Sequence, residues 1–266
     1  MNLTDVALEI RRRTLKSLYS AQSGHPGPSL SIVEMLSTLF FKEMNIKGEE
    51  RDRFILSKGH AAASFYAVLS ILGHISEDQL LTLREMGSPL QGHPVKGTLP
   101  LVDASTGSLG QGLSIGIGYA LGIKLKGQDR RVYVIIGDGE SQEGQIWEAA
   151  MAAPKFKLGN LLVIVDYNKY QNDGAVKDIM PLDPLADKWK SFGWHVQEVD
   201  GHDMDALTEA YQNARKERDK PSVIVANTMK GKGISFMEGE MSWHSKAMKP
   251  EEYESAMNEL GVKPDE

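Results

Sequence analysis

Two polar motifs in this chain each follow an apolar run that is typical of a buried β-strand. Gly137-Asp138-Gly139 comes directly after residues 132–136, and Asn168 comes thirty residues after Asp138, at the end of a second apolar run. In an open α/β sheet, ligands bind at the carboxyl ends of the strands, so we expect these side chains to lie close together. A carboxylate and an amide oxygen suit Mg²⁺, which keeps positions open for phosphate and water. The glycines let a large anion approach the backbone, so the pattern predicts a magnesium-bound phosphate site.

A purely local interpretation of these residues is the alternative. Asp-Gly is ordinary turn chemistry, and both polar side chains can cap turns or helices. The strand context and the thirty-residue spacing favour the metal site. Within that site, Asp138 offers a carboxylate oxygen, Asn168 an amide oxygen and Tyr170 its backbone carbonyl oxygen. Two phosphate oxygens and a water then complete the six ligands that Mg²⁺ takes.

Histidines form the second group of residues that can do chemistry. Four of them lie in glycine-rich or polar loops, namely His25, His60, His93 and His244. An imidazole can donate to a phosphate or a sugar hydroxyl, and it can move protons near neutral pH. Taken one at a time, each is more typical of an ordinary turn. The histidines at positions 74, 195 and 202 lack this loop context, and we interpret them as structural.

Two glycine-rich segments have the composition of anion-binding loops. The segment 107–112 opens a predicted helix, whose free N–H groups can face an anion. It reads G-x-x-G-x-G, which argues against the dinucleotide fingerprint G-x-G-x-x-G. Lys230-Gly231-Lys232-Gly233 follows a predicted strand but lacks the Walker spacing, so phosphate binding and a solvated turn are equally compatible with it.

Alternating strands and helices must position these loops. We expect strands near residues 131–136, 160–166, 194–199 and 221–228, with helices near 143–154 and 204–217 between the members of each pair. Because strand–helix–strand units cross over with a right hand, this alternation predicts an α/β fold with a parallel sheet and helices on both faces. No repeat or linker divides the chain, so we expect one domain over residues 1–266.

Further helices are indicated by apolar periodicity and by capping residues. The first covers about residues 3–20, and the last about 250–260. Ser31 with Glu34, and Ser76 with Gln79, have the spacing of capping boxes, so we expect helices to begin at both sites, the second reaching about residue 86. Asp203 precedes a helical run and is predicted to cap it.

Composition restricts the class of protein. The chain has 266 residues, of which 41% are hydrophobic and 25% charged, as is typical of a globular protein. A net charge of −6 argues against nucleic acid or an anionic membrane as the main partner. The absence of cysteine excludes disulfides and thiolate metal sites. The chain has no signal-peptide pattern at its start and no long apolar run, so we expect a cytoplasmic protein.

The motifs together resemble those of the transketolase family. Gly-Asp-Gly followed by Asn at this spacing resembles the thiamine diphosphate motif. Leu56-Ser57-Lys58-Gly59-His60 is similar to transketolases rather than to deoxyxylulose-phosphate synthases, which usually carry an Asp-Val-Gly-His phrase. The other phrases follow the family's order and are Ser23-Gly24-His25-Pro26-Gly27, Gly92-His93-Pro94, Thr106-Gly107-Ser108-Leu109-Gly110-Gln111-Gly112, Glu140-Ser141-Gln142-Glu143-Gly144, Asn168-Lys169-Tyr170 and Trp243-His244. The resemblance implies the thiamine diphosphate-binding fold.

The resemblance also implies roles for individual residues. Asp138, Asn168 and the Tyr170 carbonyl match the ligands of Mg²⁺, with Ca²⁺ or Mn²⁺ as substitutes. The residues that match groups around the cofactor are His60, Gly107, Leu109, Gly139, Asn168, Lys230, His244 and Lys246. The residues with implied catalytic parts are His25, His60, His93, His244 and Glu143. The histidines would bind sugar hydroxyls and assist proton transfer, whereas Glu143 would couple two cofactor sites across an interface or simply sit in the first turn of a helix.

The implied activity is transfer of a two-carbon ketol unit from a ketose phosphate to an aldose phosphate. A complete transketolase continues into a pyrimidine-binding domain and a C-terminal domain, whereas this chain matches the first, diphosphate-binding domain. We therefore expect the N-terminal subunit of a split transketolase, inactive alone and assembled as a heterotetramer with a C-terminal subunit. Two alternatives stay open: a related ketol transferase acting on an unusual sugar, and a catalytically silent cofactor-binding regulatory module.

Overall fold

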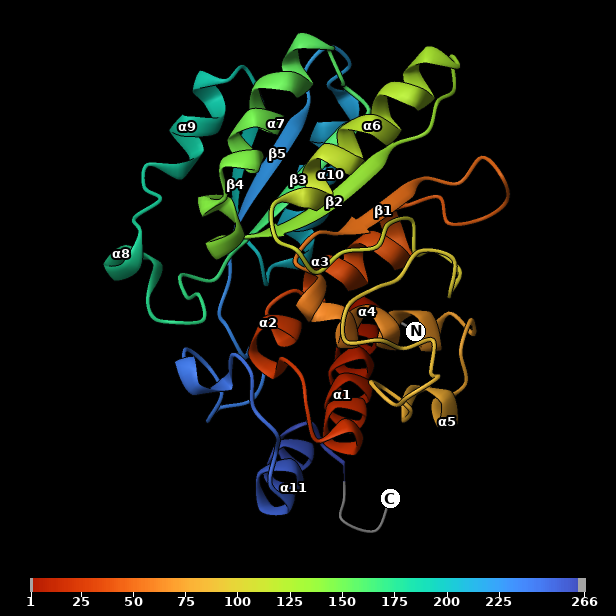
Figure 1. Ribbon diagram of the computed structural model, residues 1–266, viewed down its shortest axis with the longest axis vertical. Helices are drawn as coiled ribbons and strands as arrows, with labels where there is room; N and C mark the ends of the chain where they lie inside the picture. The colour runs from red at the N-terminus through yellow and green to blue at the C-terminus, as the bar shows by residue number, and fades with distance from the viewer. Residues whose placement is uncertain (1, 263–266) are drawn as a thin grey trace.

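A five-stranded parallel β-sheet forms the centre of the protein (Figure 1). The structure is a computed structural model that describes residues 2–262. The strands are β1 (Arg53–Leu56), β2 (Val132–Gly137), β3 (Leu161–Tyr167), β4 (His195–Asp200) and β5 (Ser222–Asn227). They lie in the order β1-β2-β3-β5-β4, and each neighbouring pair is parallel. The loops that follow the strands therefore gather at one edge of the sheet.

Helices cover both faces of this sheet, which confirms the predicted α/β fold. One layer contains α1 (Leu3–Ala21), α3 (Val33–Thr38), α4 (Ala62–Ile71) and α10 (Met204–Lys216), and the other contains α6 (Gln111–Leu125), α7 (Gly144–Lys155) and α9 (Leu185–Ser191). Because successive side chains of a strand point to opposite faces, Ile135 and Ile164 enter the first layer, and Val134 and Val163 enter the second.

Short elements complete the part of the chain that the structure describes. They are α2 (Pro26–Leu30), α5 (Glu77–Leu80), α8 (Val176–Ile179), α11 (Pro250–Glu259), a π-helix (Leu39–Glu43) and three 3₁₀ turns (Gly59–Ala61, Gly139–Gln142 and Met241–Trp243). Within residues 2–262, none of the helices is long and apolar enough to cross a bilayer. The predicted domain includes residues 1 and 263–266, which lie outside the described residues, and the single-domain assignment stays a prediction.

The four strands expected from the sequence are all present, and each of their bounds differs from the expected one by one residue. β1 is an additional strand that the sequence analysis does not predict. It has four residues, too few for a clear periodic signal, and charged residues precede it. β1 matters for the site because it places the turn that contains Lys58 and His60 at the carboxyl edge of the sheet.

The predicted capping box at Ser31 and Glu34 is wrong. α2 ends immediately before Ser31, and α3 begins at Val33 without a side-chain cap. The Ser31 hydroxyl donates to Asp166 at 2.6 Å, and Glu34 pairs with Arg11. Both side chains have partners from distant parts of the chain, and these partners replace the local cap.

The predictions for the other two caps are confirmed, although one helix is shorter than expected. Asp203 accepts from the backbone N–H groups of the first turn of α10. Ser76 accepts from the Gln79 N–H at 3.1 Å, but α5 ends at Leu80 instead of near residue 86. Turns follow, and Arg84 adopts a left-handed conformation with φ of 66°, which an α-helix does not accommodate.

Candidate active site

A cavity of about 370 Å³ lies at the carboxyl ends of β1, β2 and β3. Most of the residues predicted from the sequence contribute to its wall, namely His25, His60, His93, Gly107, Leu109, Asp138, Gly139, Glu143, Asn168, Tyr170 and His244. A larger hollow of about 650 Å³ runs along α6 and contains none of them. The smaller cavity is therefore the candidate site, because it brings together residues from seven separate segments of the chain.

Asp138 is the carboxylate that follows β2, and it is 2% exposed. One oxygen accepts from the Gly139 N–H at 2.7 Å, and the other accepts from the Lys169 N–H at 2.6 Å. Burial and the nearby Asp166 carboxylate raise the pKa of Asp138 to about 7. A buried carboxylate in this state is poorly compensated, so a cation bound beside it would be strongly favoured.

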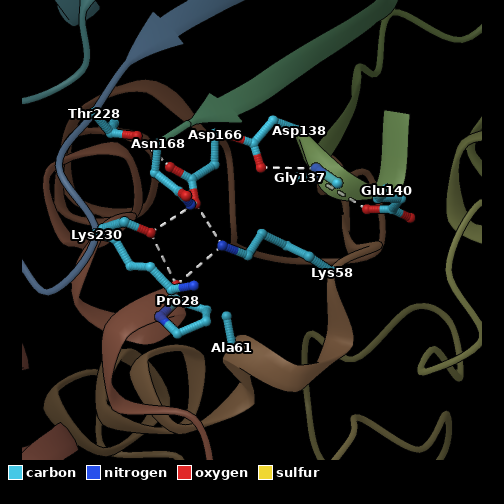
Figure 2. Close-up of polar contacts among 12 residues, drawn as sticks. Pro28, Lys58, Ala61, Gly137, Asp138, Glu140, Asp166, Asn168, Thr228 and Lys230 are labelled. Carbon is cyan, nitrogen blue, oxygen red and sulfur yellow. Dashed lines mark hydrogen bonds and ion pairs between the residues drawn. The ribbon is translucent and has the colours of Figure 1, made fainter. Parts of the chain in front are cut away.

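Asn168 follows β3, and its side-chain amide lies at the same edge of the sheet as the Asp138 carboxylate (Figure 2). Its amide nitrogen donates to Asp166 at 2.9 Å, and its amide oxygen accepts from the Tyr170 N–H at 3.1 Å. Among residues 2–262 there is no cluster of three or more His, Cys, Asp or Glu side chains that could hold a metal. A metal here would therefore combine Asp138 with amide or carbonyl oxygens and with oxygens of its ligand, as Mg²⁺ does beside phosphates.

Two residues of the cavity wall are glycines at positions where a larger residue does not fit. A Cβ atom on Gly139 would lie 2.9 Å from the Gln171 Cβ, and one on Gly107 would lie 3.1 Å from the His93 ring. Gly107 also has φ of 141°, which side chains rarely adopt. The backbone therefore lies open to the cavity between β2 and the start of α6, which fits a bound anion of diphosphate size.

Two buried acids that the sequence analysis did not select also lie at this edge of the sheet. Asp166 has no exposure and pairs with Lys58, whose Nζ lies 2.5 Å away. Glu140 accepts from the Ser57 hydroxyl, from the Gly110 N–H at 2.9 Å and from the Gly137 N–H at 3.0 Å. Glu140 thus ties the loop before α6 to the ends of β1 and β2. A charged residue inside the apolar run 161–167 was the available signal for Asp166.

The four loop histidines converge although they are far apart in the sequence. The ring centroid of His25 lies 5.1 Å from that of His60, 6.5 Å from that of His93 and 5.6 Å from that of His244. The Nδ1 atom of His25 is buried and has no hydrogen-bond partner within the described residues. An unpartnered ring nitrogen in a polar cavity is suited to a ligand hydroxyl.

Burial keeps these rings neutral at physiological pH. Burial and the charge of Arg84 lower the pKa of His25 to about 4, while burial and the Lys230 ammonium lower the pKa of His244 to about 3. Lys230 has no exposure, its Nζ lies 2.8 Å from His244 Nδ1, and burial lowers its own pKa to about 8. Because an ammonium only donates, His244 accepts at Nδ1 and carries its proton on Nε2. That N–H is then free to donate to a ligand.

We expect the histidines to make the fold sensitive to mild acid. The unfolded chain binds protons at His25 and His244 once the pH falls below about 6.5, whereas the folded chain does not, so these groups remove stability between about pH 6.5 and 4. His25→Gln should therefore flatten the fall in melting temperature over this range. The raised pKa of Asp138 has the opposite effect, because it adds stability as the pH falls. This contribution is the same in the wild type and in the histidine variants.

The control for that measurement is His74→Gln, because His74 is exposed and lies outside the cavity. Its melting temperature should follow the wild-type dependence on pH. A His25→Gln variant with the same pH dependence as the wild type and His74→Gln would contradict the assignment of a neutral buried ring.

The remaining predicted site residues differ in their distance from the cavity. Glu143 contributes to its wall and precedes the first turn of α7. Lys246 does not, since its Nζ pairs with Glu252 at 2.6 Å and lies 4.0 Å from the centre of the Trp243 ring. His74, His195 and His202, which we interpreted as structural, lie outside the cavity wall. His202 connects Glu34 to the backbone N–H of Met229.

Fold and site together define an α/β protein with a polar cavity at the carboxyl edge of a parallel sheet, where buried acids and exposed glycine backbone lie next to a cluster of histidines. The family model for the thiamine diphosphate binding domain of transketolase matches residues 4–266. The chain therefore belongs to the transketolase family.

Relatives of two lengths match this chain. It is 44% identical over 265 residues to the 6-deoxy-6-sulfo-D-fructose transketolase subunit of Clostridium sp. (strain MSTE9), covering 98% of this chain and 96% of that one. It is 44% identical to an apulose-4-phosphate transketolase subunit of Actinobacillus succinogenes, covering 96% and 94%. Human transketolase is 38% identical over 97% of this chain, which spans 42% of that longer protein.

Solved structures of transketolases also match nearly the whole of this chain with less than half of their own length. Pichia stipitis transketolase in complex with sedoheptulose-7-phosphate is 32% identical and superposes with a TM-score of 0.93, covering 99% of this chain and 41% of that one. The transketolase of Campylobacter jejuni superposes with a TM-score of 0.89 at 31% identity, covering 100% and 44%. The chain thus spans less than half the length of these solved transketolases.

Proposed function

We propose that this chain is the diphosphate-binding subunit of a two-chain transketolase that transfers a two-carbon ketol unit from a ketose phosphate to an aldose phosphate. The observation that carries the proposal is the position of Asp138 and Asn168, side by side at the ends of β2 and β3 and in one cavity with four histidines. Relatives of nearly the same length that are named transketolase subunits support it.

We propose that the cavity holds thiamine diphosphate with Mg²⁺. Asp138, the Asn168 amide oxygen and the Tyr170 carbonyl would bind the ion, for which Ca²⁺ or Mn²⁺ would substitute. Bound there, thiamine diphosphate supplies the electron sink for cleavage of the carbon–carbon bond of the ketose. The residues that would surround it are His60, Gly107, Leu109, Gly139, Lys230, His244 and Lys246. Lys246 would have to leave Glu252 in order to reach the diphosphate.

Three of the histidines would act on the sugar. Because their rings are neutral, His25 and His244 would accept or donate a proton at the C3 hydroxyl of the donor, and His93 would hold its C1 hydroxyl. Glu143 lies on the cavity wall and would couple this site to a second one across a subunit interface. In these roles His25, His93 and His244 would bind the sugar and move its protons, while Asp138 and Asn168 would bind the metal.

A second chain would supply the pyrimidine-binding and C-terminal domains, in a cytoplasmic heterotetramer.

The identity of the sugar is a further part of the proposal. Two of the matching relatives carry the names of 6-deoxy-6-sulfo-D-fructose and apulose-4-phosphate, which favours a ketol transferase for an unusual sugar as an alternative to the common pentose phosphates. The retained Asp138, Asn168 and histidine cluster speak against a catalytically silent module.

The test is to assay ketol transfer by the chain alone, by a candidate C-terminal subunit on its own, and by the mixture. The donors are xylulose 5-phosphate, fructose 6-phosphate, apulose 4-phosphate and 6-deoxy-6-sulfofructose, each with an aldose phosphate acceptor. We expect turnover only in the mixture, together with a larger mass in solution. Robust turnover by the isolated chain would refute the two-chain enzyme, and a mixture that assembles without turning over any donor would favour the silent module.

A further inference from the structure

Asp166 is a buried residue whose hydrogen bonds connect four segments of the chain (Figure 2). Its Oδ2 accepts from the Ser31 hydroxyl at 2.6 Å, from Lys58 Nζ at 2.5 Å and from Asn168 Nδ2 at 2.9 Å. Its Oδ1 accepts from the Thr228 hydroxyl at 2.5 Å. Asp166 does not contribute to the cavity wall, although Asn168 and Lys58 do. It therefore acts on a ligand in the cavity through its neighbours, and Asn168 and Lys58 are the hydrogen-bonded ones that reach the wall.

The contacts of Asn168 fix the orientation of its side-chain amide. A side-chain amide has a donor end and an acceptor end, and rotation by half a turn exchanges them. Asp166 presents an acceptor on one side, and the Tyr170 N–H presents a donor on the other. Only one orientation satisfies both, and it directs the oxygen of Asn168 away from Asp166. The opposite orientation would place an oxygen against a carboxylate and leave the Tyr170 N–H opposite an NH₂ group.

Lys58 makes Asp166 an ionised acceptor. Its side chain is buried, and its Nζ also donates to the Pro28 carbonyl at 3.1 Å. The other side-chain partners of the Asp166 carboxylate, namely Lys58, Ser31 and Thr228, also donate to it, so its oxygens act as acceptors throughout this network. An ionised carboxylate has no proton to donate, so it accepts only the nitrogen end of the Asn168 amide. The ion pair with Lys58 also offsets the charge of Asp166, which lies near the Asp138 carboxylate.

We propose that Asp166 is a positioning residue that holds the Asn168 amide with its oxygen toward the cavity, so that this oxygen is in place for a divalent ion before the ion binds. The inference rests on the proposed function for the identity of the ion, but the orientation of the amide is a property of the chain alone. Groups that orient metal ligands affect affinity strongly, and their loss commonly costs about 10- to 100-fold.

A matched pair of double variants separates orientation from charge. The acceptor variant is Lys58→Met/Asp166→Asn, and the apolar variant is Lys58→Met/Asp166→Val. Each removes one positive and one negative charge. The new asparagine keeps an oxygen that accepts from the Asn168 amide, and the Thr228 hydroxyl can accept from its NH₂ group. The new valine keeps bulk and β-propensity but offers no acceptor. Lys58→Met/Asp166→Ala replaces the apolar variant if that chain does not unfold cooperatively.

The first measurement needs no ligand. Hydrogen exchange of the Asn168 side-chain amide is followed by nitrogen-15 NMR of the full chain, with the signal assigned by its loss in Asn168→Asp. We expect the acceptor variant to keep the protection seen in the wild type and the apolar variant to lose at least about 10-fold of it. Equal protection in the two variants would overturn the proposal that Asp166 holds the amide.

The second measurement is the affinity for Mn²⁺ in the presence of thiamine diphosphate and the C-terminal subunit, from the electron paramagnetic resonance signal of free Mn²⁺. We expect the apolar variant to bind Mn²⁺ at least about 10-fold more weakly than the acceptor variant. Equal affinities, despite a difference in amide protection, would overturn the link to the metal. If the wild type itself binds no Mn²⁺, the proposed function fails, and the amide measurement still decides whether Asp166 orients Asn168.

Discussion

Replacing Asp138 with alanine should weaken the binding of Mg²⁺ and thiamine diphosphate by at least about 10-fold, because even groups that only support a metal ligand have effects of this size. Asp138 is the one charged group among the proposed ligands. Asp138 is 2% exposed, and burial raises its pKa to about 7, so the chain by itself compensates this charge poorly and a divalent cation would stabilise it. Without it, the charge of the diphosphate and metal would be poorly balanced.

The measurement is calorimetric titration of the assembled two-chain complex with thiamine diphosphate at fixed Mg²⁺. Asp173→Ala is the matched control, since Asp173 also lies on the cavity wall but is exposed. Its affinity should stay close to that of the wild type. Asp138→Ala with the affinity of the Asp173→Ala control, in a complex that remains assembled, would exclude Asp138 as a metal ligand.

The sequence allowed the main parts of the site to be predicted because their signals are local. Asp138 and Asn168 each follow a strand that is recognisable from a continuous apolar run, and parallel strands bring their carboxyl ends to the same edge. Knowing two strands was therefore enough to predict that two distant residues meet. The loop histidines needed the family resemblance as well, because a turn histidine on its own has no diagnostic spacing.

The buried residues that hold the site loops in place could not be predicted in the same way, because their hydrogen-bond partners are far away in the sequence. Lys58 and Asp166 are 108 residues apart, and Ser57 and Glu140 are 83 apart. No periodicity encodes such pairs. Ser31 shows the same limit, since its spacing to Glu34 matched a capping box, yet its hydroxyl donates to Asp166 instead. Tertiary contacts override a local preference worth about 1 kcal/mol when they satisfy a buried charge.

The site also shows which buried charges the fold itself compensates. Lys58 offsets the charge of Asp166, and three donors satisfy the oxygens of Glu140, although burial still raises the pKa of Glu140. Asp138 has only two backbone N–H donors and lies beside a second carboxylate. Buried charge without a partner is costly, so its presence at a cavity wall indicates a ligand that supplies the missing positive charge.

His60→Ala and His93→Ala should have different effects, and their comparison tests how the histidines divide the work. His60 lies in the 3₁₀ turn after β1, and burial lowers its pKa well below the ordinary value, so its neutral ring would lie against the cofactor. We expect its loss to weaken thiamine diphosphate binding by about 10-fold, the size of one hydrogen bond to a charged group. His93 instead covers Gly107, and we assign it to the sugar.

His93→Ala should leave cofactor affinity within about twofold of the wild type and lower kcat by about 10-fold or more, because its proposed partner is a sugar hydroxyl whose placement matters only during ketol transfer. Cofactor affinity from titration and steady-state turnover with saturating cofactor, both in the assembled complex, measure the two effects separately. His195→Ala is the control, since His195 lies on β4 outside the cavity wall and contacts Ser222. Equal losses of cofactor affinity in the His60 and His93 variants would show that the two rings face the same ligand, and the division between cofactor and sugar would then be wrong.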